Sequence, residues 1–505
     1  MIAQFATLLT PKQVEQIHIA SLEILADVGL LVHNEKARRL LVKHGCSLDS
    51  DSNIIKFPRR VVEHFRTLYP PTFTFHGRDP QFDRTIPDDG PLAMTASSAP
   101  NLIDPITGHE RRARSDDMAR IAHLFNELPA LDLFSVSVLC DDAPDGYFSL
   151  SRYYPALKNT VKPVRGNVPD VAEAQKIIKL GELIAGSEGV FRERPFITFH
   201  YCAVVSPLTL GSDSTELLIY LTENGFPGYS SIVPNAGLTS PLTLLGTLVQ
   251  GNAEFLAWAT LQEIVRPGAE LIYSVFPTVG DMRTGAYAPG GIETGIMIMG
   301  FSQMARYYNV PSAGYSGLTN AKLADAQAGF EKGMSPSIGV LAGLDLLNVA
   351  GLIDALMTFD FSMMVIDDEI MAMIKRVKRG LEFSAENMAL DLIAEAGPAG
   401  MFLDKQHTVD RMKSCAFLPQ VADRDMRETW LEKGGLDAQS RAIQRVRDIL
   451  TRDNPAVFSP EVDARIRAEF TGLVSGNSVP PSGWKRVSAA QTNNKKRRRQ
   501  RKFSR

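Results

Sequence analysis

From residue 131 onward the sequence repeats one pattern, a short apolar run followed by a helical segment. The expected strands are 131–139, 162–165, 196–204, 228–232, 271–276, 312–315, 345–349 and 361–366. Helices are expected near 145–159, 170–186, 212–224, 241–265, 292–308, 321–342 and 350–358, and a last helix near Asp368. Continuous apolar runs are typical of parallel strands that are covered on both faces. Eight alternations predict an α/β fold, a (β/α)8 TIM barrel, rather than an open doubly wound sheet. No GxGxxG follows the first run, which weakens a dinucleotide-binding interpretation.

A barrel of this kind needs about 250 residues, so a chain of 505 residues must carry extensions. Residues 1–130 read as helices and β-hairpins, with Thr10-Pro11 opening the first helix as an N-cap and first-turn proline. The predicted domains are this N-terminal extension at 1–130, the barrel at 131–380, a C-terminal helical extension at 381–474, and a disordered basic tail at 475–505.

The net charge of −3 conceals an uneven distribution. Residues 495–505 hold eight Lys and Arg and no acid, so the other 46 basic residues face 57 acidic ones. An acidic body gives no reason to expect nucleic-acid binding. The basic segment could contact a polyanion, but a solvated terminus is the expected state.

Four widely spaced cysteines predict reduced thiols rather than a disulfide framework. No basic and apolar leader is visible at the N-terminus, and the most apolar stretch, 335–359, contains Asp345, Asn348 and Asp354. These features predict a cytoplasmic protein without a membrane span.

Polar and aromatic residues gather where the predicted strands end, which is where such barrels place their sites. Tyr201, Phe276, Tyr287 and Tyr315 could surround one cavity. Aromatic faces attract cations without a hydrogen bond, which suits a quaternary ammonium group. The simpler interpretation of each ring is packing at the barrel rim.

His200 and Cys202 should point to the same face of their strand, and Cys140 ends the first strand. These residues raise the alternative of a zinc site, although no third ligand has a diagnostic spacing. A hydrogen-bonded rim histidine beside a packed thiol is the expected arrangement, with no metal ligand assigned.

Polar groups are dense in 311–334, PSAGYSGLTNAKLADAQAGFEKGM, an apolar run that breaks into a turn and then a helix. Asn320, Gln327 and Glu331 are its candidate catalytic residues, and Asn348 follows at the next strand end. Gln327 and Glu331 share a helix face, but ordinary solvation of that face competes with a functional role. Gly290-Gly291 could offer backbone N–H groups to a carboxylate, or could serve only a turn.

Several stretches together make the sequence resemble the trimethylamine:corrinoid methyltransferase family over about residues 10–470. They are GRDPQF at 77–82, SPLTL at 206–210, SPLTLLGTLVQGNAE at 240–254, NVPSAG at 309–314, NAKLADAQAGFEK at 320–332, and GLIDALMTFDFSMMVIDDEI at 351–370. The resemblance implies a TIM barrel that passes a methyl group from an amine to the Co(I) corrinoid (cobalamin type) of a separate protein. No D-x-H-x-x-G cobalt-ligand motif occurs in this chain, so we expect no bound cofactor here and a corrinoid protein as partner.

The resemblance also places Leu318 where the trimethylamine enzymes of the family carry pyrrolysine. Leucine has no electrophilic imine, so the sequence is similar to the pyrrolysine-free branch that demethylates quaternary amines such as glycine betaine. We therefore expect Leu318, Tyr315, Phe276, Tyr201 and His200 to contact the substrate. Further candidates are Tyr287, Asn348 and, for a substrate carboxylate, Arg283.

Two alternatives remain open from the sequence. One is a non-catalytic binder of quaternary amines that keeps the pocket. The other is a trimethylamine or zinc-assisted methyltransferase. We also expect a homo-oligomer.

Overall fold

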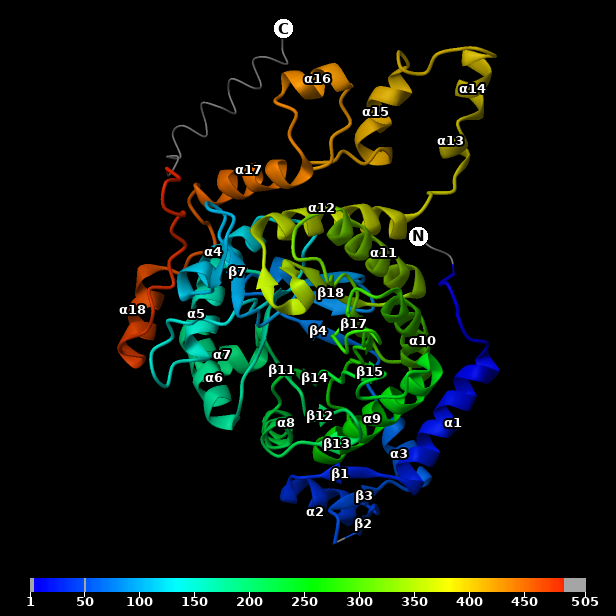
Figure 1. Ribbon diagram of the computed structural model, residues 1–505, viewed down its shortest axis with the longest axis vertical. Helices are drawn as coiled ribbons and strands as arrows, with labels where there is room; N and C mark the ends of the chain where they lie inside the picture. The colour runs from blue at the N-terminus through cyan, green and yellow to red at the C-terminus, as the bar shows by residue number, and fades with distance from the viewer. Residues whose placement is uncertain (1–3, 50, 486–505) are drawn as a thin grey trace.

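The computed structural model describes residues 4–49 and 51–485 of the chain. They form a mixed α/β fold with short strands at the centre and helices around them (Figure 1). The basic segment 495–505 lies outside the described residues.

Two groups of parallel strands form the centre. The first has the order β14 (Gly228–Ser230), β11 (Ile197–Tyr201), β10 (Val164–Asn167) and β9 (Phe134–Ser135). The second has the order β17 (Ala313–Tyr315), β18 (Leu346–Ala350) and β6 (Leu92–Thr95). All neighbours within both groups are parallel.

Isolated parallel bridges connect the two groups. Met94 of β6 pairs with Leu133 just before β9. On the other side, segment 271–276 bridges to both groups, through Val275 to Ile232 and through Tyr273 to Ser312. The predicted strands from 131–139 to 345–349 therefore all lie in this parallel arrangement.

The predicted strand at 361–366 is wrong, because these residues begin helix α12 (Phe361–Arg379). Asp360 caps that helix by accepting hydrogen bonds from the backbone N–H groups of Ser362 and Met363. A short apolar run cannot by itself distinguish a buried strand from a buried helix. The strand beside β18 is instead β6, which comes from the segment expected to be an N-terminal extension.

The predicted helix at 350–358 is also wrong. These residues form β19 (Leu352–Ile353), a short 3₁₀ turn (Asp354–Leu356) and β20 (Thr358–Phe359). β20 pairs with β7 (Asn101–Ile103), which pairs with β8 (Glu110–Arg112), so long-range pairing replaces the local helix.

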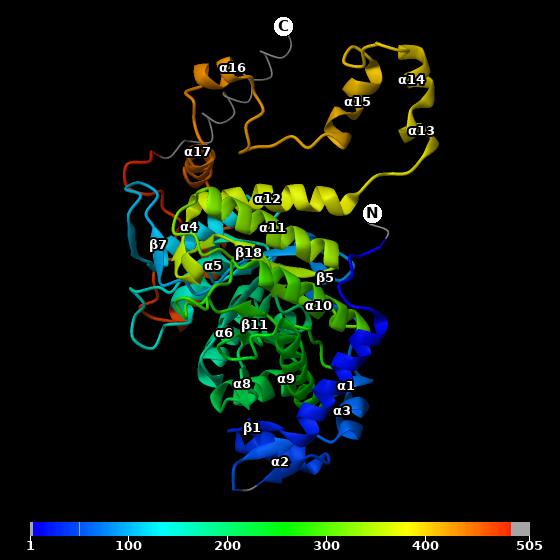
Figure 2. The same ribbon diagram turned by 45° about the vertical axis from the view of Figure 1, so that its right-hand side comes forward.

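Of the helices that cover the strands, six lie close to the ranges predicted after the strands, and two, at 115–126 and 188–193, lie outside those ranges. The covering helices are α4 (Ser115–Asn126), α5 (Leu150–Asn159), α6 (Val171–Ala185), α7 (Glu188–Glu193), α8 (Asp213–Glu223), α9 (Leu244–Val265), α10 (Ile292–Tyr308) and α11 (Ala326–Ala342). Figure 2 shows α10, α11 and α12 stacked beside the central strands.

The N-terminal residues form a small unit at the lower end of the view in Figure 1. It contains α1 (Pro11–Asp27), β1 (Leu30–Val32), α2 (Glu35–Lys43), β2 (Ser47–Asp49), β3 (Ile54–Lys56) and α3 (Arg59–Arg66). Thr10 and Gln13 form a capping box at α1, as the Thr10-Pro11 pair predicts. β1 pairs with β3 and with β13 (Thr209–Leu210), which pairs with β12 (Val204–Val205) and joins this unit to the body.

A second hairpin packs against the amino-terminal ends of two central strands. It consists of β4 (Phe73–Phe75) and β5 (Arg84–Ile86). Phe73, Phe75 and Ile86 pack into one buried cluster with strand residues that include Leu92 and Leu346. We call this set of side chains, enclosed by the strands, the inner cluster. A larger cluster lies between the strands and the helices, and we call it the outer cluster.

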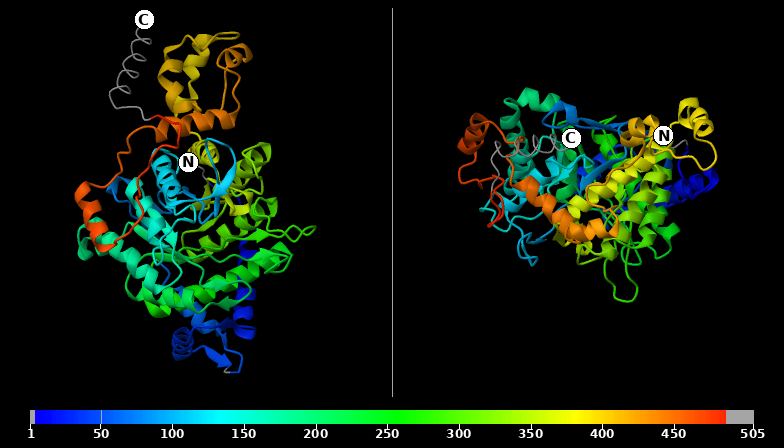
Figure 3. Two further views of the ribbon diagram at one scale, coloured as in Figure 1. Left: turned by 60° about the vertical axis from the view of Figure 1, so that its left-hand side comes forward. Right: turned by 90° about the horizontal axis from the view of Figure 1, so that it is seen from above.

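The C-terminal residues include a projecting arm, residues 381–436 (Figures 1 and 3). It carries α13 (Ala385–Met388), α14 (Leu390–Ala396), α15 (Gln406–Cys415) and α16 (Arg427–Glu432), none of which buries a side chain. The Glu369 carboxylate anchors it by accepting the backbone N–H groups of Gln420, Val421 and Ala422.

After the arm, the chain returns to the body. Helix α17 (Ala438–Leu450) packs on α12, and α18 (Pro460–Glu469) packs on α6. Of the predicted tail, residues 475–485 are described, and the carbonyl oxygen of Gly476 accepts a hydrogen bond from Asn159. In the described part of the chain, no helix combines the length and the apolar character that a membrane crossing would need.

Candidate functional site

The loop between β17 and α11, residues 316–325, lies at the carboxyl end of its strand and is held by hydrogen bonds along its length. Asp325 ends the loop and caps α11 by accepting from the backbone N–H groups of Gln327 and Ala328. The polar turn chemistry of the sequence thus fixes where the loop stops and the helix begins.

Glu331, one turn into α11, is the centre of this network. Its Oε2 accepts the Thr319 hydroxyl hydrogen and, at 2.9 Å, the backbone N–H of Asn320. Its Oε1 accepts from the Gln327 side-chain amide at 2.9 Å. The structure therefore brings together Glu331, Asn320 and Gln327, and the hydrogen bonds show a role in holding the loop.

Asn320 links this loop to the preceding one. Its Nδ2 donates to the Tyr287 carbonyl oxygen at 3.0 Å, and its Oδ1 accepts the Gly290 N–H at 3.0 Å. Of the two roles left open for the glycine pair, N–H donation to a ligand or a turn, the first does not apply to the Gly290 N–H, which donates to Asn320. Two loops at the strand ends are thereby fastened to each other.

A buried ion pair contacts the backbone of this loop. Lys332 Nζ donates to the carbonyl oxygens of Gly317 and Val349, both at 2.7 Å, and lies 3.3 Å from the Asp367 carboxylate. Burial raises the pKa of Asp367 to about 6, although the Lys332 ammonium opposes that rise. The charge pair ties α11 and α12 to the loop backbone next to Leu318.

Leu318 itself is 2% exposed and belongs to the outer cluster. Gly317 beside it has φ +121°, and a Cβ there would come within 2.8 Å of Val349. The loop therefore needs glycine at 317 to fold the leucine inward.

Two of the predicted aromatic residues meet. The rings of Phe276 and Tyr315 lie 4.7 Å apart in the inner cluster, where Tyr229 also packs. Burial raises the pKa of the Tyr315 hydroxyl to about 12, so it is neutral at physiological pH. Tyr287 contributes to this region through its backbone carbonyl oxygen and through its side chain, whose hydroxyl interacts electrostatically with that of Tyr315. Tyr201 belongs to the outer cluster and lies near α8 and α9.

His200 lies beside the inner cluster. Its Nε2 is hydrogen-bonded to Ser231 Oγ, and its ring packs 5.6 Å from that of Tyr229. Burial, with a smaller effect of the Arg165 charge, holds the pKa of His200 well below its ordinary value, which favours a neutral imidazole.

The two cysteines of the suggested zinc site differ: Cys202 is exposed, whereas Cys140 is buried. Cys140 Sγ donates to the Ser151 carbonyl oxygen. Within residues 4–49 and 51–485, no group of three or more His, Cys, Asp and Glu side chains is arranged to hold a metal ion. The geometry thus gives the zinc-assisted alternative no support.

The last two predicted residues differ in burial. Arg283 is 87% exposed and its guanidinium pairs with the Asp281 carboxylate in its own loop. Asn348 is buried in register with Tyr315, and its Oδ1 finds no hydrogen-bond partner among the described residues. Asn348 is therefore close to the aromatic pair, whereas Arg283 faces solvent.

Sequence reasoning missed Arg165, Tyr229 and Lys332. Arg165 is 2% exposed on β10, its Nε donates to Ser135 Oγ at 2.8 Å, and its guanidinium lies 5.6 Å from the Tyr229 ring centroid. A charged residue closing the apolar run 162–165 was the available signal.

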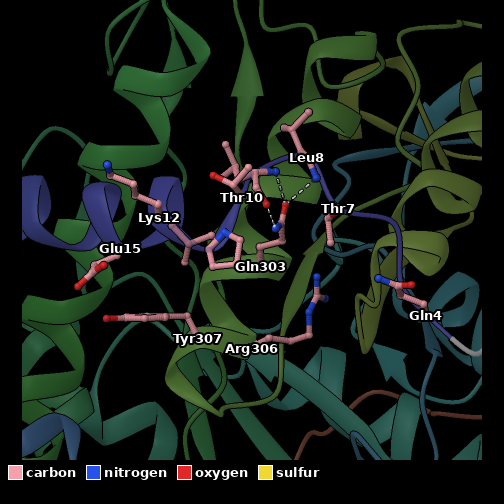
Figure 4. Close-up of a pocket in the computed structure, with 12 residues that line it drawn as sticks. Gln4, Thr7, Leu8, Thr10, Lys12, Glu15, Gln303, Arg306 and Tyr307 are labelled. Carbon is pink, nitrogen blue, oxygen red and sulfur yellow. Dashed lines mark hydrogen bonds between the residues drawn. The ribbon is translucent and has the colours of Figure 1, made fainter.

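An open groove elsewhere is not part of this arrangement. It lies between the start of α1 and α10 and is lined by residues that include Thr10, Lys12, Arg306 and Tyr307 (Figure 4). Gln303 there accepts from the N–H groups of Leu8 and Leu9, so it fastens the N-terminal segment to α10.

Comparison with known proteins identifies relatives along nearly the whole chain. Residues 2–472 match the family described as trimethylamine methyltransferase (MTTB). A trimethylamine methyltransferase of Desulfitobacterium hafniense is 29% identical over 90% of this chain and 91% of its own. A glycine betaine methyltransferase of the same species is 30% identical over 91% of this chain and 96% of its own.

Among solved structures, a dihydropteroate synthase from Coxiella burnetii aligns with a TM-score of 0.38 and 11% identity, covering 61% of this chain and 98% of that one. A likeness of this size carries no weight for the fold. The resemblance drawn from the sequence motifs is confirmed by the family match.

Proposed function

Because the chain belongs to the trimethylamine methyltransferase family, we propose that this methyltransferase takes a methyl group from a quaternary amine, such as glycine betaine, and passes it to the Co(I) corrinoid of a separate protein. Overall identity does not select the amine, since the trimethylamine and glycine betaine enzymes are 29% and 30% identical to it. The choice rests on the loop after β17.

The proposed scaffold is a (β/α)8 barrel with N- and C-terminal extensions. The parallel pairs and bridges from β6 through β9, β10, β11, β14, segment 271–276, β17 and β18 back to β6 support it. In such a barrel the loop after β17 lies at the mouth, together with the ends of the other strands.

The observation that carries the proposal is Leu318, a buried aliphatic side chain in that loop. It offers no electrophile to a tertiary amine. A quaternary nitrogen needs none, because its C–N bond breaks with the electron pair remaining on nitrogen and a neutral tertiary amine leaves. The protein then has only to desolvate the substrate and aim the methyl group.

The Phe276–Tyr315 pair suits that task. Aromatic faces stabilise a desolvated cation, and both rings lie in the inner cluster beside Tyr229. Glu331 and Asn320 act as positioning residues that hold the loop around this site.

A group of exposed apolar side chains supports a docking surface for the corrinoid protein. Leu238, Leu242 and Met282 are about half exposed and lie together around Gly237, in loops that follow β15 (Asn235–Ala236) and β16 (Thr278–Val279). Apolar side chains gathered at a surface favour protein contact. The corrinoid supplies the methyl-accepting nucleophile when its carrier protein is bound. We also expect a cytoplasmic homo-oligomer.

The test supplies a reduced corrinoid protein with glycine betaine, other quaternary amines and trimethylamine, and follows methyl–cobalt formation by absorbance. Methylation with a quaternary amine and none with trimethylamine is the expected result. Activity with trimethylamine alone would overturn the proposal. Tight binding of a quaternary amine, with no transfer to any corrinoid protein, would show a non-catalytic binder instead.

A further inference from the structure

Arg165 is a buried cation for which the described part of the chain provides no anionic partner. Its side chain lies on β10, almost without solvent exposure, and among the described residues no Asp or Glu forms an ion pair with it. Its Nε donates to the neutral Ser135 hydroxyl, and its Nη1 is buried with no hydrogen-bond partner in the described part of the chain. Burying an unpaired charge is costly, so such a group is usually paired in the functional state.

A second buried arginine, Arg152, shares two of these features among the described residues: no acid forms an ion pair with it, and its Nη1 finds no hydrogen-bond partner. Arg152 is also buried, but its guanidinium donates to Ser98 Oγ at 2.9 Å, to Asn167 Oδ1 at 3.0 Å and to backbone carbonyl oxygens of the β9 region. These hydrogen bonds give Arg152 a structural role within the protein. Among the described residues, Arg165 has fewer partners: its Nε donates to Ser135, and its guanidinium meets Tyr229 through a ring contact and a side-chain hydrogen bond.

The surroundings of Arg165 are those of the proposed amine site. Its guanidinium faces the ring of Tyr229, which packs in the inner cluster with Phe276 and Tyr315. The Arg165 charge lowers the pKa of both His200 and Tyr315. At His200 it adds to the larger effect of burial, whereas at Tyr315 it opposes the larger effect of burial.

A fixed positive charge beside an aromatic cation site would repel a simple cation such as trimethylammonium or choline. The repulsion becomes attraction when the same ligand carries an anion, because a carboxylate can pair with the guanidinium while the ammonium meets the rings. Arginine is suited to this role, since its planar N–H groups match both carboxylate oxygens.

We propose that Arg165 binds the carboxylate of the substrate, so that the enzyme is built for trimethylammonium carboxylates rather than for cations without an anionic group. This inference rests on the proposed function and assigns to Arg165 the role that the sequence suggested for Arg283.

The first experiment needs no variant. Calorimetric titration of the full-length protein uses glycine betaine, choline, tetramethylammonium and tert-butylacetate, the uncharged-head isostere of glycine betaine. Glycine betaine is expected to bind tightest, and tert-butylacetate is expected to bind measurably because it retains the carboxylate. Binding of choline or tetramethylammonium as tight as that of glycine betaine would overturn the inference.

The second experiment compares Arg165→Gln, Arg165→Lys and Arg39→Gln, the last removing an exposed charge on α2 as a matched control. We expect Arg165→Gln to weaken glycine betaine binding roughly 10- to 100-fold, the range of a hydrogen bond to a charged group. Arg165→Lys should fall between this variant and the wild type, and Arg39→Gln should equal the wild type. Thermal unfolding checks that each variant is folded.

The outcomes separate the two proposals. Unchanged betaine affinity in folded Arg165→Gln, or its loss in Arg283→Gln alone, refutes the role of Arg165. If choline supports methyl–cobalt formation as well as glycine betaine does, the carboxylate inference fails and the proposed function stands. If no quaternary amine binds or reacts, the proposed function fails first.

Discussion

Gly290 lies directly against the carboxylate of Glu331: a Cβ atom on Gly290 would come within 2.5 Å of Oε2 and within 2.7 Å of Cδ. The same Oε2 holds Thr319 and the Asn320 backbone, so the carboxylate cannot move aside without releasing the loop. The glycine is thus required by close approach, whatever its backbone conformation.

Gly290→Ala should therefore impair methyl transfer. The added methyl group must displace Glu331, and overpacking of this kind costs about 1–3 kcal/mol. The matched control is Gly333→Ala in α11, where a Cβ meets no atom within 4 Å, and which should stabilise the helix by about 0.5–1 kcal/mol. Rates and urea unfolding check both variants, and wild-type rates in Gly290→Ala would contradict the close approach.

Glu331→Gln should lower kcat more than it changes KM. The amide NH2 group replaces one acceptor oxygen of the carboxylate, so one of the donors from Thr319, Asn320 or Gln327 faces an N–H group. Leaving a buried donor without an acceptor costs about 1–3 kcal/mol. Because Glu331 positions the loop, the bound amine is misaligned rather than released. Steady-state kinetics decide the matter: a variant with an unchanged kcat would leave Glu331 without a positioning role.

Lys332→Met should destabilise the fold by about 3–5 kcal/mol, because it leaves the Asp367 carboxylate buried without its partner. Lys332→Met combined with Asp367→Leu should recover part of that loss, since no unpaired charge remains. Chemical denaturation of the single and double variants measures this. If the destabilisation of the double variant equals the sum of the destabilisations of the two single variants, loss of the ion pair is not what destabilises Lys332→Met.

Leu318→Ala should change the fit of the amine indirectly, by loosening the packing of the loop after β17, without abolishing methyl transfer. Removing a buried leucine costs about 2–5 kcal/mol, so a control for stability alone is needed. Leu180→Ala, in α6 and fully buried, serves as that control and should leave KM unchanged. Complete loss of methyl transfer in folded Leu318→Ala would show that leucine takes part in the chemistry.

Stability should fall as pH rises from about 4.5 to about 7 because of Glu263. Burial raises the pKa of this carboxyl from 4.5 to about 7, so the folded state binds its proton more tightly than the unfolded state does. The protonated carboxyl contributes its full stabilisation below the unfolded pKa, and this stabilisation is lost as the pH rises through the folded pKa. The free energy of unfolding changes by about 1–2 kcal/mol after allowance for solvent screening.

Glu263→Gln cannot ionise and should remove that decline. Its Gly268 N–H contact can be kept by the amide oxygen. Thermal unfolding from pH 4 to pH 8 compares the two proteins, and parallel pH profiles would exclude Glu263 as the source.

The sequence by itself determined what depends on near neighbours along the chain. Thr10 and Gln13 cap α1, the helix predicted at 292–308 is α10 (Ile292–Tyr308), and the polar stretch after residue 315 forms the loop and α11. Capping and helical periodicity act over a few residues, so they can be read directly. The motifs also identified the family.

Only the tertiary structure decided what depends on distant partners. Residues 361–366 form a helix and β6 lies beside β18, because burial and pairing with remote strands outweigh the local apolar pattern. The same holds at the site: Tyr201 packs in the outer cluster, the Glu331 carboxylate is hydrogen-bonded within its own loop, and Arg165 is buried with no acidic partner among the described residues. Side-chain direction and pairing of buried charges are set by contacts between residues far apart in sequence, and no local pattern contains them.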